Sequence, residues 1–309
     1  MLVFLPSWLR GGLAYLLIIV CTLALAASLH LFALVKYLLP QAGWRRFFTR
    51  TLTAHAEAWN ACNGLIVKVF LAMSLEFRCS EPLVRNAWYL VLSNHQTWWD
   101  AIVLYQVLCG RIPLPKGFMK KELLYLPLFG TAAALLDFPV MHRYNRSVLT
   151  AHPELAGRDL EETRRACRHF VEVPTTVFNF VEGTRKTAEN YRRQQPPYHH
   201  LLKPKAGGIA FVFESMGTLL DTVLDLTIVY PDGEPSFWGF LSGRCRRVVV
   251  DLRRLETPSW IGTRSYRDDL DYRRDFQHWL RAHWAEKDRR IEAMLAETRH
   301  GVAPYDTDH

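Results

Sequence analysis

The group of residues best suited to chemistry is NHQTWWD, residues 94–100, in which His95 and Asp100 are five positions apart. It follows an apolar run, 88–93, that is typical of a buried strand. If a helix begins within this group, the Asp100 carboxylate can bond one ring nitrogen of His95 and leave the other free to accept a proton. Because the chain has no Gly-x-Ser-x-Gly motif, this predicts a histidine base that acts on a substrate hydroxyl. The alternative is a helix-capping Asn94 beside a structural histidine.

A second group is the tetrapeptide EGTR, residues 182–185. It follows the β-branched and aromatic run 175–181, which is predicted to be a strand. A flexible glycine, a hydroxyl and an arginine at the end of a strand can hold an anionic group, and Arg185 can bind phosphate through two donors. Glu182 could orient that arginine or a backbone amide. The alternative is an ordinary turn with a surface salt bridge.

The elements that position these groups alternate between strand and helix along the chain. Short apolar runs predict strands at 88–93, 175–181, 222–230 and 247–252. Longer segments predict helices at 102–108, 120–125, 159–171 and 205–216. The alternation predicts an α/β fold with a largely parallel central sheet flanked by helices. Ligands of such sheets bind beyond the carboxyl ends of the strands, where both groups lie.

The last predicted element is a charged helix over 268–297, whose apolar residues are spaced to form one face. We expect that face to pack on the core through Phe276, Leu280, Trp284, Ile291 and Leu295. A contact of Trp279 and Trp284 with lipid headgroups is the alternative.

An apolar run near the start of the chain predicts a membrane anchor. Residues 13–35 contain no Asp, Glu, Lys or Arg, and as a helix they would span roughly 34 Å, enough to cross the hydrocarbon core. The alternatives are a signal peptide that ends near residue 26 and a buried helix of a soluble protein. Four basic residues follow this run and one precedes it, so the positive-inside rule predicts that the body lies in the cytoplasm; the four are Lys36, Arg45, Arg46 and Arg50.

A shorter apolar run, 64–77, contains Lys68 and Glu76. It is too short to span a bilayer comfortably, so we expect an interfacial or re-entrant helix, or core. These observations divide the chain into an N-terminal membrane anchor, 1–80, and a catalytic domain, 81–309, that ends in the amphipathic helix.

Composition excludes several classes of protein. With 50% hydrophobic residues and a net charge of +8 over 309 residues, the chain is too apolar to be disordered and long enough to bury a sizeable core. Its six cysteines are widely spaced without a CxxC pair, which favours neither a zinc site nor a disulfide scaffold. The excess positive charge is concentrated before Glu57, around the apolar run, so it indicates a membrane surface and not nucleic acid.

Together, the two groups resemble signatures of the glycerolipid acyltransferases, whose best-known members are the 1-acyl-sn-glycerol-3-phosphate acyltransferases. The first signature, NHxxxxD, matches Asn94, His95 and Asp100, and the third, usually FPEGTR, matches FVEGTR at 180–185. The segments that resemble the second and fourth signatures are 138–143 and 226–231, and those that resemble further family segments are 120–123 and 202–207. The resemblance covers about residues 80 to 235 and is strongest to a bacterial inner-membrane subgroup related to lysocardiolipin-type enzymes. Val181 stands where the family usually has Pro, and the second signature lacks its usual early Gly.

The resemblance implies transfer of an acyl group from acyl-CoA or acyl-acyl carrier protein to the sn-2 hydroxyl of lysophosphatidic acid, which gives phosphatidic acid. His95, held by Asp100, would take the hydroxyl proton, without an acyl-enzyme, a metal or a cofactor. The residues implied in substrate binding are Asn94, Lys120, Arg143, Glu182, Gly183, Thr184 and Arg185. The implied partners are membrane lipids, the two substrates and, for one donor, acyl carrier protein. The implied location is a membrane, the cell inner membrane in a bacterium.

Three alternatives remain open. The acceptor could be another lysophospholipid, which only substrate assays can distinguish. A metal hydrolase would use His95 and Asp100 with His199 and His200, although such sites normally gather three or more ligands. A non-catalytic membrane scaffold would tolerate replacement of His95.

Overall fold

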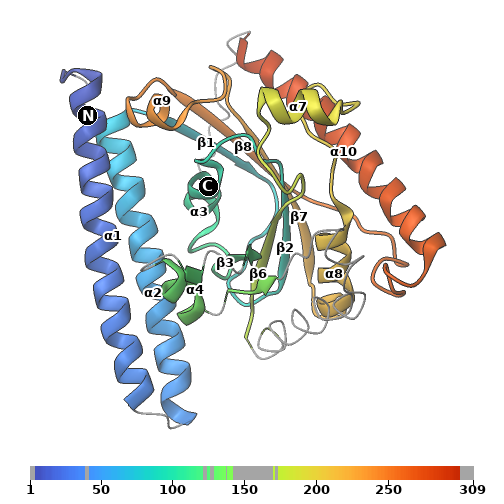
Figure 1. The fold of residues 1–309 in the computed structure, drawn as a ribbon, viewed down its shortest axis with the longest axis horizontal. Coiled ribbons are helices and arrows are strands. Elements are labelled where there is room, and N and C mark those ends of the chain that lie inside the picture. The colour runs from blue at the N-terminus through green and yellow to red at the C-terminus, as the bar shows by residue number, and fades with distance from the viewer. Residues whose placement is uncertain are drawn as a thin grey trace.

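A six-stranded sheet forms the centre of the molecule (Figure 1). The computed structural model describes residues 4–38, 42–120, 124–125, 129–136, 138–141, 170 and 173–299. The strand order is β1-β8-β7-β2-β6-β3. The strands are β1 (Ser74–Cys79), β2 (Tyr89–Ser93), β3 (Pro115–Gly117), β6 (Thr176–Phe180), β7 (Thr222–Val229) and β8 (Arg247–Arg254).

The sheet is largely parallel, as the alternation of elements predicts. Neighbouring strands run parallel except β7 and β8, which are antiparallel. All five residues of β2 are buried, and its side chains alternate between the two faces: Leu90 and Leu92 point to one core, Tyr89 and Val91 to the other. This burial on both faces explains why the strand reads as a continuous apolar run.

Helices cover both faces of the sheet. One face packs against α8 (Ala206–Met216) and α10 (Leu270–Arg299), and the other against α3 (Asp100–Leu108) and α9 (Phe237–Leu241). The smaller described elements are α4 (Phe129–Leu135), α7 (Ala188–Gln194) and a two-stranded pair, β4 (Met119–Lys120) with β5 (Val140–Met141). The prediction of a helix at 120–125 is wrong at its start, because Lys120 ends β4. The predicted helix at 159–171 lies outside the described residues, except for residue 170.

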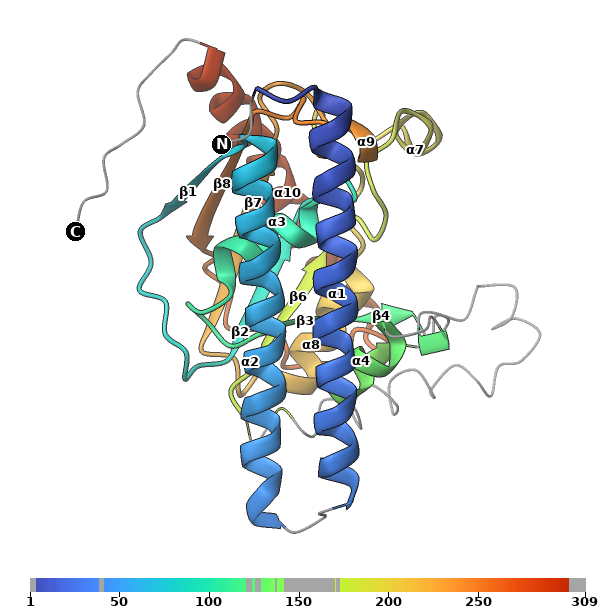
Figure 2. The same ribbon diagram turned by 90° about the vertical axis from the view of Figure 1, so that its left-hand side faces the viewer.

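Two long antiparallel helices stand beside the α/β body: α1 (Ser7–Leu38) and α2 (Ala42–Ile66) (Figure 2). The stretch Ser7–Phe32 of α1 is long and apolar enough to cross a membrane by length and composition. Helix α1 also contacts the body: Gly11 approaches α9 so closely that a Cβ there would lie 2.9 Å from the Leu241 carbonyl oxygen. Near the other end of α1, His30 Nε2 bonds Thr131 Oγ1 of α4 at 2.5 Å.

Of the two expectations for residues 64–77, the helix is wrong from residue 74 onward, and the alternative, core, is confirmed for Val67 and Leu71. Helix α2 continues through a π-helical turn, Val67–Leu71, and the chain then turns at Ala72 into strand β1. Glu76 of β1 bonds Arg78 and Arg247, so its charge is satisfied at the sheet edge. Strand β1 therefore belongs to the sheet although it precedes residue 80, where the sequence suggests a boundary. A short apolar run with two charges does not distinguish helix from strand.

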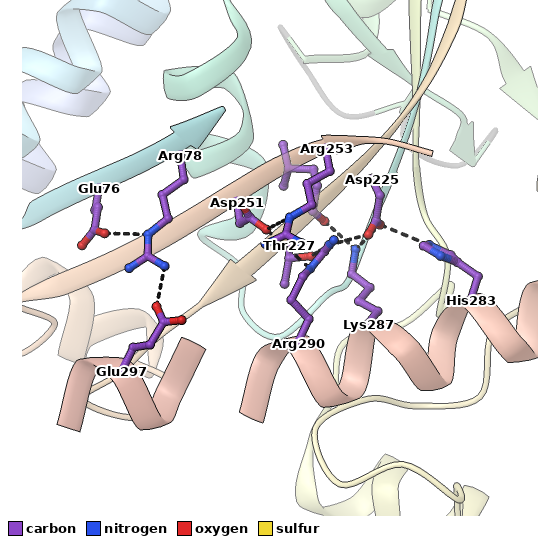
Figure 3. A network of polar contacts seen from close by, with 11 residues as sticks. Glu76, Arg78, Asp225, Thr227, Asp251, Arg253, His283, Lys287, Arg290 and Glu297 are labelled. Atoms are coloured by element: carbon purple, nitrogen blue, oxygen red, sulfur yellow. Dashed lines mark hydrogen bonds and ion pairs between the residues drawn. The ribbon is translucent and has the colours of Figure 1, made fainter. Parts of the chain in front are cut away.

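The C-terminal helix α10 is held to the sheet by a buried polar network (Figure 3). Lys287 Nζ lies 2.5 Å from Asp225 Oδ1 and 2.7 Å from the Leu226 carbonyl oxygen, and Arg290 bonds Asp225 and Thr227. Burial alone would raise the pKa of Asp225, but Lys287, His283 and Arg290 hold it well below its usual value. Loss of one partner would leave a buried charge uncompensated, so the network fixes where α10 lies.

The apolar face of α10 packs as the sequence predicts. Phe276, Leu280, Trp284 and Ile291 are buried in the core beneath the sheet, with Leu295 partly buried beside them. Trp284 donates its indole N–H to the Leu202 carbonyl oxygen at 3.0 Å. Because Trp284 is fully buried, it does not face lipid headgroups.

Candidate active site

The turn after β2 is joined to β7 by a side chain that takes the place of a peptide group. Asn94 is fully buried; its amide nitrogen donates to the Ile228 carbonyl oxygen at 2.9 Å, and its amide oxygen accepts the Ile228 N–H at 2.9 Å. These two bonds extend the β2–β7 pairing by one residue beyond Ser93, the last residue of the strand. In this structure Asn94 therefore holds the turn to β7. Its contact with substrate stays a prediction.

His95 and Asp100 meet as the spacing predicts. His95 Nδ1 lies 2.8 Å from Asp100 Oδ2, and the same oxygen accepts the backbone N–H groups of Gln96 at 2.5 Å and Thr97 at 2.9 Å. Asp100 is the first residue of α3 and is fully buried. Three donors on one oxygen leave little freedom of rotation, so the carboxylate holds the imidazole in one orientation.

The second carboxylate oxygen of Asp100 is also occupied. Tyr230, which directly follows β7, donates its hydroxyl to Asp100 Oδ1 at 2.7 Å. The Thr97 hydroxyl lies 3.0 Å from the same oxygen and 3.1 Å from the Tyr230 hydroxyl. Sequence reasoning misses Tyr230, although it sits beside Pro231 in the segment that resembles the fourth signature.

The imidazole of His95 packs against an aromatic ring from the neighbouring strand. It stacks on Phe180 of β6, with ring centroids 4.0 Å apart and planes 12° from parallel. Its side chain is 19% exposed, and among the described residues nothing bonds Nε2. The ring is therefore supported on one face, oriented through Nδ1, and able to take a proton at Nε2.

The loop after β6 lies against the turn after β2. The Val181 N–H donates to the Ser93 carbonyl oxygen at 3.0 Å, and the Lys186 N–H donates to the His95 carbonyl oxygen at 2.8 Å. Between them the chain turns back at Gly183, whose φ of +65° favours glycine. These backbone bonds bring the two sequence groups to one edge of the sheet, as the predicted parallel strands require.

Arg185 of the EGTR loop contacts Trp98 of the turn after β2. Its guanidinium carbon lies 3.9 Å from the centre of the Trp98 ring, a cation–π contact, and Trp98 is 64% exposed. Among the described residues no carboxylate pairs with Arg185, so its donors are available to an anion. The neighbouring Thr184 hydroxyl accepts from the Asn190 side chain at 3.3 Å, and that side chain also donates to the Arg185 carbonyl oxygen at 2.9 Å.

Glu182 differs from the rest of the loop because it is fully buried. Within the described part of the chain, neither of its carboxyl oxygens has a hydrogen-bonding partner of good geometry. Burial raises the pKa of Glu182 well above its usual value; the backbone amide of Leu202 opposes this effect, and the charge of Asp100 adds to it. The contact of this buried carboxyl group with substrate stays a prediction.

The other predicted residues are placed less completely. Lys120 ends β4, but its side chain is outside the described residues, as is all of Arg143. His199 and His200 donate their backbone amides to Asp288 of α10. No group of three or more His, Cys, Asp or Glu side chains in the described part of the chain is arranged to hold a metal ion.

Comparison with known proteins shows which family the chain resembles. The sequence profile of the acyltransferase family matches residues 74–231, which is slightly more than half of the chain. Lysocardiolipin acyltransferase 1 of Gallus gallus is 24% identical over 220 residues, covering 65% of this chain and 52% of that protein. The 1-acyl-sn-glycerol-3-phosphate acyltransferase 3 of Arabidopsis thaliana is 24% identical over 211 residues, covering 63% of this chain and 51% of that protein. The chain thus spans about half the length of these curated relatives.

The fold also matches a solved structure. The crystal structure of PlsC from Thermotoga maritima, a 1-acyl-sn-glycerophosphate (LPA) acyltransferase, aligns over 96% of this chain and 99% of that chain. The TM-score is 0.54 and the sequence identity 15%, a likeness of fold. The family profile spans β1 to β7 and includes the His95–Asp100 pair and the EGTR loop: this chain is a member of the acyltransferase family.

Proposed function

We propose that this protein transfers an acyl group from acyl-CoA or acyl-acyl carrier protein to the sn-2 hydroxyl of lysophosphatidic acid. The observation that carries this proposal is the pairing of a fixed His95 with a nearby Arg185. In the described part of the chain, nothing bonds His95 Nε2 and no carboxylate occupies the donors of Arg185. One group suits removal of a hydroxyl proton and the other suits a phosphate. The names of the plant relatives and of the PlsC structure support the same substrate class.

In the proposed reaction, His95 Nε2 accepts the proton of the sn-2 hydroxyl as its oxygen attacks the thioester carbonyl carbon. A C–O bond forms and the C–S bond breaks, and the protonated imidazole returns the proton to the departing thiolate. Asp100 stabilises the imidazolium that exists between these steps. The hydroxyl is itself the nucleophile, so the mechanism needs no acyl-enzyme, metal or cofactor beyond the thioester.

Arg185, with the Gly183 turn and the Thr184 hydroxyl, is proposed to hold the phosphate of the acceptor. A guanidinium can give phosphate two parallel hydrogen bonds, which orients the glycerol as well as binding it. Lys120 and Arg143 stay predicted contributors to the same anion site. Asn94 and Glu182, both fully buried, also stay predicted contributors.

A second acceptor is favoured by one observation, the match to a relative named lysocardiolipin acyltransferase. Such an acceptor also carries a phosphate and a free hydroxyl on glycerol, so the same residues would serve it. The two acceptors differ in the size of the headgroup, and a direct competition between them decides.

We propose that α1 attaches to the membrane by lying along its surface and not by crossing it perpendicularly. Contacts with the body extend from Gly11 to His30, about 30 Å of helix and as long as the hydrocarbon core is thick. A perpendicular crossing with these contacts intact would carry the body into the hydrocarbon. The predicted crossing by the stretch Ser7–Phe32 stays the alternative to this proposal. The exposed apolar side chains of α1 include Leu16, Val20, Leu23, Leu31 and Leu34, which would then face lipid. The cytoplasmic side remains a prediction from the charges that follow the helix.

The experiment is acyl transfer from oleoyl-CoA to lysophosphatidic acid in detergent micelles, for wild type, His95→Ala and His278→Ala. His278 is an exposed histidine on α10 and is the matched control. We expect product with wild type and His278→Ala, and a loss of at least a hundredfold in kcat with His95→Ala, consistent with removal of a general base. Equal activity of His95→Ala and wild type would overturn the mechanism. Product from lysocardiolipin alone would move the proposal to the second acceptor.

A further inference from the structure

Asp100 carries more hydrogen bonds than orientation of His95 alone requires. Its Oδ2 faces His95 and two backbone amides, while its Oδ1 receives the Tyr230 hydroxyl at 2.7 Å. Tyr230 is almost fully buried and comes from a different element, the end of β7. The bond therefore ties the catalytic turn to a strand that lies 130 positions further along the chain.

The register of the sheet explains why Tyr230 is in reach. Ser93 at the end of β2 is paired with Leu226 of β7, and Asn94 is bonded to Ile228, so β7 continues past the end of β2 and into the site. Tyr230 follows directly and its ring is buried in the core on the side of α3. Burial, and then the charge of Asp100, raise the pKa of Tyr230 well above its usual value, so its hydroxyl stays protonated as a donor.

We propose that Tyr230 is a positioning residue for the His95–Asp100 pair: its hydroxyl fixes the carboxylate plane and shares the negative charge of Asp100. This inference rests on the proposed function, in which His95 is the base. Without the hydroxyl, the charge that faces the imidazole increases. An imidazolium is then held more firmly, and free imidazole becomes available only at higher pH.

Other ionisable groups face this pair and are constant in the comparison below. Glu182 approaches Asp100 from the loop after β6, and Cys245 approaches Tyr230 from the segment before β8. The Thr97 hydroxyl, which contacts both Asp100 Oδ1 and the Tyr230 hydroxyl, can replace part of a lost bond. We therefore expect a moderate effect and not a complete loss.

The experiment compares Tyr230→Phe with Tyr89→Phe in the full chain. Tyr89 is the matched control because it is buried on the adjacent strand β2 and its hydroxyl accepts the Val84 N–H at 3.1 Å. For Tyr230→Phe we expect kcat about three- to tenfold lower, the range for loss of one hydrogen bond, with an unchanged KM for the lysolipid. The acidic limb of the kcat/KM profile moves to higher pH, by a few tenths of a unit. Tyr89→Phe leaves both unchanged.

A second readout needs no substrate. The imidazole NMR signal of His95, assigned by its loss in His95→Gln, is titrated in wild type and both tyrosine variants. We expect its midpoint to move to higher pH in Tyr230→Phe only. If wild type acylates no lysolipid, the proposed function fails, and this titration still decides the role of Tyr230.

The inference is overturned if Tyr230→Phe, shown to be folded by circular dichroism, has the pH profile and imidazole titration of wild type. If that variant does not fold, Thr97→Val and Thr97→Ser are compared instead, because only the first removes the hydroxyl. We expect Thr97→Val to shift the titration and Thr97→Ser to match wild type; identical titrations in the two would contradict the role.

Discussion

The turn after β2 and the loop after β6 meet at one edge of the sheet. Each contains a buried carboxyl group, but the two groups differ in how many hydrogen-bonding partners they have. Asp100 accepts bonds from two backbone amides, a tyrosine and a threonine in addition to His95. Glu182 is equally buried and has no partner of good geometry among the described residues. The first group is complete before a substrate arrives, and the second is not.

This difference corresponds to two tasks. A base must be oriented in advance, because reorientation during the reaction costs rate. A loop that recognises an anion can leave donors open for the ligand to complete, which is the role proposed for Arg185 beside the Trp98 ring. We infer that the turn after β2 determines kcat and that the EGTR loop determines KM, which the following variants examine.

The largest effect is expected for Asp100→Asn. An amide at this position cannot accept bonds on both sides, and it releases His95 from its orientation. We expect kcat to fall by about a thousandfold or more with little change in KM. Steady-state kinetics of Asp100→Asn and of Asp221→Asn measure this, because Asp221 also accepts a backbone N–H, that of Trp88 at 2.7 Å. A change in KM alone would contradict the assignment.

Arg185→Ala is expected to have the next largest effect, on KM and not on kcat. Loss of a charge-assisted bond to phosphate raises KM for the lysolipid about ten- to a hundredfold and leaves kcat nearly unchanged. The control is Arg192→Ala, an exposed arginine of α7 whose Nε donates to the Ala188 carbonyl oxygen of its own helix. If kcat falls as much as it does in Asp100→Asn, the division between the two regions is wrong.

A smaller change in KM is expected for Trp98→Ala, because the ring only supports the guanidinium. An exposed cation–π contact contributes about 0.5–1 kcal/mol, which corresponds to a two- to fivefold rise in KM. Trp98→Phe keeps an aromatic face and is expected to stay within twofold of wild type. The pair of variants separates ring support from simple loss of packing; equal KM values for both would remove the role of the ring face.

The smallest effect concerns stability and pH. The raised pKa of Glu182 means that the folded state binds its proton more tightly than the unfolded state, where the value is near 4.5. Its contribution to stability is therefore greatest below that pH and decreases as the pH rises towards the folded-state value. Glu182→Gln removes this decrease, so its Tm should exceed that of wild type more at pH 8 than at pH 5. Thermal melts across this range measure the difference. If the Tm of both proteins depended on pH in the same way, burial of the Glu182 charge would not destabilise the fold.

Residues that are close in sequence could be placed from sequence alone. The spacing of His95 and Asp100 predicts their contact because a strand-to-helix turn is local geometry, and the strands at 88–93 and 175–181 follow from their apolar runs. The α/β fold follows from the alternation of elements.

Contacts that depend on strand order could not be placed in this way. Tyr230 reaches Asp100 and Phe180 reaches His95 only because β7 and β6 both flank β2, and no local pattern fixes that order. The partner of Asn94 is a further example, because only the position of Ile228 shows where its amide group bonds. Strand β1 could not be predicted, because its apolar run is continuous in sequence with the end of a helix.

The two hydrogen bonds between the Asn94 side chain and the Ile228 backbone also have a consequence for motion. A side chain that is paired like a backbone group cannot swing away alone; its release requires the ends of β2 and β7 to separate. The amide hydrogen of Ile228 should therefore exchange with deuterium as slowly as those in the middle of the sheet, although it lies at the border of the active site. The turn that carries His95 is then expected to open only when the ends of these two strands separate.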